Sequence, residues 1–208
     1  MNRIDNSIYN NLTLLKEDLQ GWNGNSKIFQ KLIKSKVPKL IIEVGSWKGQ
    51  SAITMAECIK KNSFDTKIIC VDTWLGALEF WDKFKDTPER DLFLKNGYPQ
   101  VYYQFLSNVV HRNVEDIITP FPNTSVIASR YFKNNSIVAD MIYIDASHDE
   151  LDVYFDLKNY YDILSEGGIL FGDDFNNWKG VSNAVKKFCK EVNKTFKIEE
   201  RNFWVIEK

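Results

Sequence analysis

Four acidic residues in this sequence stand at the ends of short apolar runs: Glu43, Asp72, Asp145 and Asp173. Such runs are typical of buried strands in a parallel sheet. Because ligands bind open α/β sheets beyond the carboxyl ends of the strands, the four carboxylates are expected at one edge. Carboxylates there accept hydrogen bonds from hydroxyl groups or bind a divalent cation. The pattern therefore predicts a site for a polar ligand at that edge.

The first of these carboxylates begins the stretch EVGSWKG at residues 43–49, between a predicted strand and a predicted helix. Glycine permits unusual backbone angles and lets a ligand approach the main-chain N–H groups closely. Asp72, at the end of the next predicted strand, can accept hydrogen bonds from both hydroxyls of a ribose. The alternative is an ordinary strand-to-helix turn with an aspartate that caps a helix. The stretch also lacks the G-x-G-x-x-G pattern of dinucleotide sites and the Gly-Lys-Ser/Thr of a Walker loop.

A second acidic group consists of Asp145, Asp173 and Asp174, which meet if their two strands are neighbours. Three carboxylates in one place repel one another, and a divalent cation relieves that repulsion. Oxygen ligands with no nearby cysteine favour Mg²⁺, with Ca²⁺ or Mn²⁺ as alternatives, over zinc. The alternative places Asp145 alone at the ligand edge and makes Asp174 a solvated helix cap.

The sequence contains two histidines, and His148 follows Asp145 by three residues. An imidazole with a pKa near neutrality can remove the proton of a hydroxyl group as that group reacts. His148 and Asp145 are therefore the candidate catalytic residues. A surface histidine that caps a helix is the alternative for His148.

The elements that must position these residues alternate along the chain. Helices are predicted over residues 50–61, 124–132, 148–164 and 180–192, and the spacing of Ser147 and Glu150 predicts a capping box for the third. Strands are predicted over residues 40–44, 67–72, 117–120, 141–145 and 169–173, and a C-terminal hairpin over 196–199 and 203–206. This order predicts a Rossmann-like, doubly wound α/β fold with a mainly parallel seven-stranded sheet and an antiparallel C-terminal hairpin. We expect one domain over residues 1–208, with an aromatic-rich, lid-like insertion at about 74–116.

Composition narrows the classes of partner. The formal net charge is −1, which argues against a nucleic-acid partner. No apolar run approaches the roughly 20 residues needed to cross a bilayer. The three cysteines are far apart in apolar contexts, as expected of buried thiols in a reducing compartment. We therefore expect a cytoplasmic protein that acts on a small molecule, with a homo-oligomer possible in principle.

The motifs resemble those of class I S-adenosylmethionine-dependent methyltransferases. EVGSWKGQS at 43–51 is similar to their motif I, and VDTW at 71–74 is similar to their ribose-binding acidic motif. YIDASH at 143–148 and GDDF at 172–175 resemble paired motifs of the macrocin O-methyltransferase-like and cephalosporin hydroxylase-like subgroup. The resemblance covers most of the chain, from Lys39 to Val192.

The resemblance implies roles for individual residues. Glu43, Gly45 and Ser46 would hold the amino-acid end of the cofactor, and Asp72 its ribose. Thr124 and Ser125 would lie beside the adenine, whereas Trp74 would pack on the adenine face or belong to the lid. The three aspartates would coordinate Mg²⁺, which orients two substrate oxygens. The other cofactor-binding positions that it implies are Gly49, Ser51, Thr73 and Asp145.

O-methylation of a small hydroxylated molecule, such as a sugar, is the leading functional interpretation. Methyl transfer is an in-line displacement that depends on positioning, and a closed lid would exclude water. The segment GWNG at 21–24 is expected to add a second wall. Two alternatives are an oxygenase-like or nicotinamide-dependent enzyme on the same scaffold, and a non-catalytic module that binds the cofactor.

Overall fold

The computed structural model describes residues 6–82 and 86–208, and a mixed sheet with strand order β3-β2-β1-β4-β5-β7-β6 runs through it. The first five strands of that order are parallel, β7 is antiparallel to β5, and β6 is antiparallel to β7. This confirms the predicted seven-stranded sheet with a C-terminal hairpin. The strands are β1 (Leu40–Val44), β2 (Lys67–Asp72), β3 (Ile118–Pro122), β4 (Ala139–Ile144), β5 (Leu164–Gly172), β6 (Phe196–Glu199) and β7 (Phe203–Glu207).

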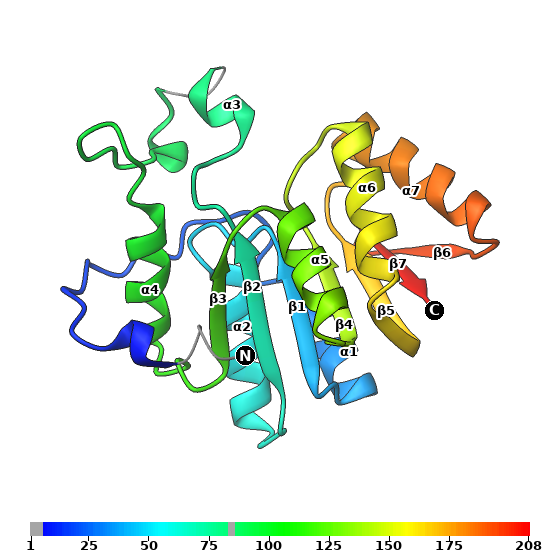
Figure 1. Ribbon diagram of the computed structural model, residues 1–208, viewed down its shortest axis with the longest axis horizontal. Coiled ribbons are helices and arrows are strands. Elements are labelled where there is room, and N and C mark those ends of the chain that lie inside the picture. The colour runs from blue at the N-terminus through cyan, green and yellow to red at the C-terminus, as the bar shows by residue number, and fades with distance from the viewer. Residues whose placement is uncertain (1–5, 83–85) are drawn as a thin grey trace.

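Helices cover both faces of the sheet (Figure 1). Successive side chains of a strand point to opposite faces, so Ile41 packs in one core cluster and Ile42 in the other. One face is covered by α1 (Lys27–Lys36), α2 (Gln50–Lys61) and α4 (Val101–His111). The other is covered by α5 (Ser125–Asn134), α6 (Glu150–Tyr161) and α7 (Lys179–Glu191).

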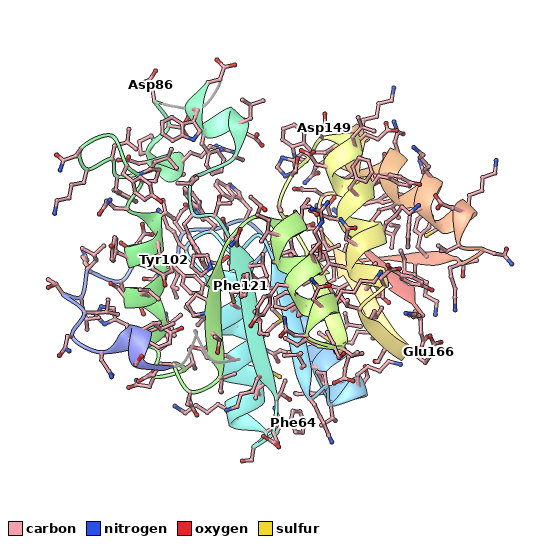
Figure 2. The ribbon with its side chains drawn as sticks, in the orientation of Figure 1. Phe64, Asp86, Tyr102, Phe121, Asp149 and Glu166 are labelled. Carbon is pink, nitrogen blue, oxygen red and sulfur yellow. The ribbon has the colours of Figure 1, made fainter. Side chains whose placement is uncertain are left out.

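The strand order reverses at β1, whose two neighbours are β2 and β4. A doubly wound sheet opens a crevice at such a point, beyond the carboxyl ends of the strands. The start of α6 and the short helix α3 (Leu78–Trp81) lie at one end of the molecule (Figure 1). Figure 2 places Asp86 and Asp149 at that end, and Phe64 and Glu166 at the opposite end. The predicted site residues therefore belong to one edge of the sheet.

The boundary between α6 and β5 differs from the prediction. The helix expected over 148–164 covers only Glu150–Tyr161, and β5 begins at Leu164 and continues through Gly167 and Gly168. Leu164 pairs with Ala139 of β4, so this apolar residue belongs to the sheet and not to α6. The predicted capping box is also wrong, because the carboxylate of Asp149 caps the helix by accepting the N–H of Leu151.

Other boundaries moved by one or two residues. The strand expected over 117–120 covers Ile118–Pro122, and the helix expected over 124–132 covers Ser125–Asn134. Asp145 and Asp173 each lie one residue beyond the strand that they were expected to finish. These shifts leave the order of elements unchanged.

The predicted insertion at about 74–116 consists of two different parts. Residues 74–100 carry α3 and the short 3₁₀ helix η2 (Pro88–Arg90), whereas Val101–His111 forms α4. Val101, Phe105 and Val109 of α4 are fully buried, so this helix belongs to the layer that covers the sheet. A further 3₁₀ helix, η1 (Asn6–Tyr9), lies near the N-terminus. Residues 1–5 and 83–85, which the predicted domain and insertion include, lie outside the described residues.

Two expectations from composition can be compared with the structure. Cys58, Cys70 and Cys189 are free and buried, as predicted. Among the described residues, no helix is long and apolar enough to cross a membrane.

Candidate active site

The turn between β1 and α2 depends on its two glycines. Gly45 has φ +88°, and a Cβ atom there would lie 2.1 Å from the carbonyl oxygen of Asp145. The N–H of Gly45 donates to the carbonyl of Val71 at 2.9 Å, and the N–H of Asp145 donates to the carbonyl of Val44 at 2.8 Å. Gly49 also has φ +88°, and a Cβ atom there would lie 2.9 Å from the ring of Phe105. The turn is therefore packed so closely against its neighbours that side chains are excluded at both positions.

Glu43 supports this turn from within the protein. Its side chain is fully buried, and its carboxylate accepts hydrogen bonds from Ser46 Oγ at 2.6 Å, Ser51 Oγ at 2.5 Å and Cys70 Sγ at 3.4 Å. Burial, with a smaller contribution from the charge of Asp72, raises the pKa of Glu43 to about 7. Glu43 therefore fixes the two serines rather than presenting its carboxylate at the surface of the turn.

Asp72 faces the same turn from the end of β2. Its Oδ2 accepts the N–H groups of Ser46 at 2.8 Å and Trp47 at 2.9 Å, and its Oδ1 accepts the N–H of Trp74 at 2.7 Å. A carboxylate offers about four acceptor positions, so three are used within the protein. A ribose could take the remaining position directly and a second one by displacing an N–H group of the turn.

Trp74 and Thr124 have structural partners in this conformation. The ring of Trp74 is 2% exposed and packs against Tyr102 and Phe105, while its Nε1 donates to the carbonyl of Trp47 at 2.8 Å. Its ring therefore lies in the core beneath the turn, although residue 74 begins the segment that carries α3. The hydroxyl of Thr124 caps α5 by accepting the N–H of Ile127 at 3.3 Å.

Two further residues of the predicted cofactor set are partly exposed at this edge. The hydroxyl of Thr73 accepts the N–H of Leu75 at 3.2 Å. Ser125 begins α5, and its carbonyl accepts the hydroxyl of Tyr160 at 3.0 Å. Both residues therefore border the carboxyl end of the sheet, on the β2 side.

The acidic group lies next to the turn and is held by donors from several segments. Asp145 accepts the hydroxyl of Tyr143 at 2.8 Å. Asp173 is 4% exposed and accepts the side-chain amides of Asn23 at 2.8 Å and Asn202 at 2.5 Å. It also accepts the N–H of Asp174 at 2.7 Å. The carboxylate of Asp173 therefore has three donors within the protein.

The residues closest to a metal-binding arrangement are Asp145, His148 and Asp174. One ligand atom from each lies within 4.8 Å of the other two. Asp173 is not in this group, so the fold brings together a set that differs from the predicted three aspartates. Two carboxylates suit Mg²⁺ or Mn²⁺, and an imidazole as third ligand favours Mn²⁺ or another transition metal over Mg²⁺.

The three aspartates differ in how readily their carboxyl groups ionise. Burial and the charges of Asp173 and Asp174 raise the pKa of Asp145 to about 8. Burial also raises the pKa of Asp173, although its hydrogen bonds oppose the shift. Burial acts to raise the pKa of Asp174 too, but the hydrogen bond from His148 and other donors outweigh it and lower that pKa. Asp174 therefore carries the negative charge most firmly, and Asp145 is the residue that a cation would ionise.

His148 lies between two carboxylates. Its Nδ1 is 2.9 Å from Oε1 of Glu79, and its Nε2 is 3.0 Å from Oδ2 of Asp174. The ring stacks on Trp178, with centroids 4.2 Å apart and planes 7° from parallel. Burial acts to lower the pKa of His148, but the two carboxylates outweigh it and raise that pKa above its ordinary value. Both ring nitrogens are thus engaged, and the charged imidazolium is favoured in this conformation.

Aromatic side chains connect the turn with two segments outside the sheet. Trp47 of the turn lies 4.9 Å from Phe80 of α3 and 6.4 Å from Trp22 of the N-terminal segment, measured between ring centroids. Trp22 and Phe80 are 6.2 Å apart, and the guanidinium of Arg90 lies 4.7 Å from the ring of Trp22. The predicted second wall at 21–24 therefore lies against the turn, and Asn23 of that segment reaches Asp173.

Several residues of this edge were not identified by sequence reasoning. Glu79, Trp178 and Asn202 carry no local pattern that marks them, because each acts through a partner elsewhere in the fold. Tyr143 lies within the YIDASH motif, but the motif gives it no role of its own, and its partner is Asp145. Lys48 lies within the EVGSWKG stretch, and its side chain is buried with Nζ 2.7 Å from Asp18. The one available signal was a lysine inside an otherwise tightly packed turn.

A family model described as a methyltransferase domain matches residues 42–175, a range that begins in β1 and includes every residue of the acidic group. No curated protein sequence matches the chain significantly.

Solved structures with a similar fold include an O-methyltransferase from Bacillus cereus in complex with SAH (15% identity, TM-score 0.59, covering 98% of this chain and 87% of that one). Another is the O-methyltransferase TomG from Streptomyces achromogenes in complex with SAM (11% identity, TM-score 0.61, covering 91% and 82%). A third is the calicheamicin methyltransferase CalS11 (17% identity, TM-score 0.62, covering 86% and 77%). At these identities the structures demonstrate a shared fold.

Proposed function

The chain belongs to the methyltransferase-domain family, and from that premise we propose that it transfers the methyl group of S-adenosylmethionine to a hydroxyl group of a small molecule. Two of the similar structures are named as O-methyltransferases bound to SAH or SAM, which supports both the cofactor and the atom methylated. Three free, buried thiols suit the reducing environment of the cytoplasm.

The observation that carries the proposal is the geometry around the β1–α2 turn. Gly45 brings the turn against the backbone of Asp145, and Asp72 faces the N–H groups of Ser46 and Trp47. A nucleoside laid across the carboxyl ends of β1 and β2 would meet Asp72 with its ribose. Its other end would then point toward Asp145. The cofactor's reactive end and the acidic group are therefore neighbours in this arrangement.

We place the acceptor hydroxyl beside Asp145, His148 and Asp174, which line a small pocket at this edge. In the reaction, the acceptor oxygen forms a bond to the methyl carbon as the bond from that carbon to sulfur breaks. The products are the methyl ether, S-adenosylhomocysteine and one proton. Neutral His148 can take that proton through Nε2. For this, the imidazole must have lost its own proton from Nε2, and the hydroxyl must replace Asp174 as its neighbour.

A divalent cation is the second way to prepare the hydroxyl. Asp145 and Asp174 would hold the cation, and their mutual repulsion together with the raised pKa of Asp145 supports such a role. When bound, the cation would lower the pKa of a coordinated hydroxyl. If Nε2 of His148 were a third ligand, the imidazole could not also accept the proton. The two roles of His148 therefore exclude each other.

The experiment that tests the function is a product screen. The protein is incubated with S-adenosylmethionine and mixtures of sugars, phenols and other hydroxylated molecules, and mass spectrometry detects products heavier by one methylene. We expect at least one acceptor whose methylation is lost in Asp72→Ala. Methylation at nitrogen or carbon alone would contradict the proposed acceptor atom.

The same assay separates metal from base. Enzyme treated with a chelator should lose activity and regain it with Mg²⁺ or Mn²⁺ if a cation prepares the hydroxyl. Full activity after chelation would end the metal proposal and leave His148 as the base. His148→Ala in the presence of metal then reports how much of the rate depends on the imidazole, with a loss of about 10²- to 10⁴-fold expected for a base.

A further inference from the structure

The orientation of the His148 ring is set by three contacts of different kinds. Trp178 stacks on one face, Asp174 lies 3.0 Å from Nε2, and Glu79 lies 2.9 Å from Nδ1. The side chains of His148 and Glu79 are 24% and 22% exposed, so their contact is largely shielded from water. Shielding from water strengthens a charged hydrogen bond. The imidazole is therefore held in one orientation, with Nε2 directed toward the pocket that contains Asp145.

Asp174 and Trp178 come from the edge of the sheet, whereas Glu79 comes from a different segment of the chain. Asp174 and Trp178 lie in the connection between β5 and α7, which begins with Asp173. Glu79 belongs to α3, in the segment between β2 and α4. The bond to Nδ1 therefore exists only while α3 lies over the edge.

The same short helix also contacts the turn between β1 and α2, through Phe80, the residue after Glu79. Phe80 packs on Trp47 and on Trp22, and Arg90 from the same segment lies over the rings of Trp22 and Phe80. Trp47 is itself joined to the N-terminal segment, because its Nε1 donates to Gln20 at 3.2 Å. α3 thus contacts the turn through Phe80 and the histidine through Glu79.

We propose that Glu79 is a positioning residue for methyl transfer, which aims Nε2 of His148 at the acceptor hydroxyl when α3 lies over the site. This inference rests on the proposed function of His148 as the base. A carboxylate at one ring nitrogen fixes the plane of an imidazole and keeps the proton on that nitrogen, which leaves the other nitrogen to act on the substrate. The base is therefore assembled from the sheet edge and the α3 segment together.

A direct test measures the ring, not the reaction. The chain contains two histidines, so protein labelled with ¹⁵N-histidine gives ring signals from His111 and His148 alone. In the wild type we expect a slowly exchanging Nδ1–H signal from His148. Glu79→Ala should lose it, and Glu79→Gln should keep it because the amide oxygen still accepts. Glu89→Ala removes an exposed carboxylate of the same segment and serves as the control.

Kinetics supply the second readout, with an acceptor found by the product screen. Loss of the partner that orients a catalytic imidazole should lower kcat by about 10- to 100-fold in Glu79→Ala, with KM for the acceptor changed by less than about threefold. Glu79→Gln should recover most of kcat. The shift in melting temperature caused by S-adenosylhomocysteine should be the same in all variants, which shows that each is folded and binds the cofactor.

The outcomes are distinct. An unchanged His148 ring signal in Glu79→Ala overturns the proposal, whatever the activity. A changed signal with unchanged kcat also overturns it, because the contact would then only attach α3 to the protein. If no acceptor is ever methylated by the wild type, the proposed function fails, and the ring signals still decide whether Glu79 orients His148.

Discussion

Two neighbouring regions are built in different ways: the turn between β1 and α2, where we propose that the cofactor binds, and the edge that carries Asp145, His148, Asp173 and Asp174, where we propose that the acceptor binds (the acceptor edge). The turn is one short stretch of the chain, and its carboxylate partners come from the two strands beside it: Glu43 of β1 binds Ser46 and Ser51, and Asp72 of β2 binds the N–H groups of the turn. The acceptor edge is assembled from the N-terminal segment, α3 and the connections after β4, β5 and β6. One region is a local motif and the other is a product of the whole fold.

The two regions also differ in charge. In the turn, the pKa of Glu43 is raised by burial, but three donors surround the carboxyl group. At the acceptor edge, Asp145, Asp173 and Asp174 share one place with Glu79, and the cationic partner there among the described ion pairs is His148. The turn is thus electrostatically complete without a ligand, whereas the edge favours a cation or protons. This difference supports our proposal that the turn holds the cofactor and that the acid–base chemistry takes place at the acceptor edge.

The largest effect is expected from Gly45→Ala. The new Cβ would lie 2.1 Å from the carbonyl oxygen of Asp145, at a backbone angle of +88° that alanine disfavours. We expect the free energy of unfolding to fall by about 3 kcal/mol or more, with loss of cofactor binding, as measured by denaturant unfolding.

Gly97→Ala is the matched control for Gly45. Gly97 has φ +79°, and a Cβ atom there would meet no other atom within 4 Å, so its substitution adds backbone strain alone, about 1–2 kcal/mol. Equal losses at the two positions would show that close packing against Asp145 has no special role.

A smaller effect is expected from Asp72→Ala. The substitution leaves three N–H groups of the turn and of Trp74 without their acceptor, so the protein should lose about 2 kcal/mol of stability before any ligand is added. The melting-temperature shift with S-adenosylhomocysteine should vanish as well. Asp65→Ala, an exposed aspartate, should change stability by less than about 0.5 kcal/mol. If ligand-free Asp72→Ala melts at the wild-type temperature, the hydrogen bonds of Asp72 do not stabilise the turn.

The smallest expected effect is a dependence of the melting temperature on pH. The pKa values of Glu43 and Asp145 are raised to about 7 and about 8, above their unfolded values of 4.5 and 3.8. The folded state therefore retains protons that the unfolded chain releases, and stability is lost as pH rises through the folded pKa values. The raised pKa of His148 acts in the same direction. In chelator, we expect the melting temperature to fall as the pH rises from about 5 to about 8, and to fall less in Asp145→Asn.

A melting temperature that rises over this range would contradict the assignment of protons to the acceptor edge. Added Mg²⁺ or Mn²⁺ should flatten the slope if Asp145 and Asp174 bind a cation, because the cation replaces the proton on Asp145. If the pH dependence of the melting temperature is the same with and without metal, no cation binds there, and bound protons alone relieve the repulsion among the aspartates.

Sequence reasoning succeeded where a segment specifies itself. The bounds of β1, β2, α2 and β6 agree with the predictions, since each is an apolar or amphipathic run between clear ends. It missed α4 because Gln104, Ser107 and Asn108 interrupt the apolar stripe of that helix. Those polar residues are buried because they bond to the N-terminal segment at residues 15–18. A pattern within the helix does not contain that partner.

The candidate site shows the same difference between residues that local patterns identify and contacts that only the fold creates. The residues of the turn could be named from the sequence, as could Asp145, His148 and the Asp173–Asp174 pair. The contacts that decide their roles could not be named. Glu79 meets His148 across the carboxyl edge of the sheet, and Asn23 meets Asp173 from the N-terminal segment. Long-range contacts of this kind depend on the tertiary fold, so they leave no periodic or local signal in the chain.

The measurement that tests the central claim most directly is a calorimetric titration of the wild-type protein with S-adenosylhomocysteine, with NADH titrated in parallel. We predict saturable binding of one S-adenosylhomocysteine per chain, abolished in Asp72→Ala, and no saturable heat with NADH. Absence of binding by S-adenosylhomocysteine, or equal binding of NADH, would contradict the proposed methyltransferase site.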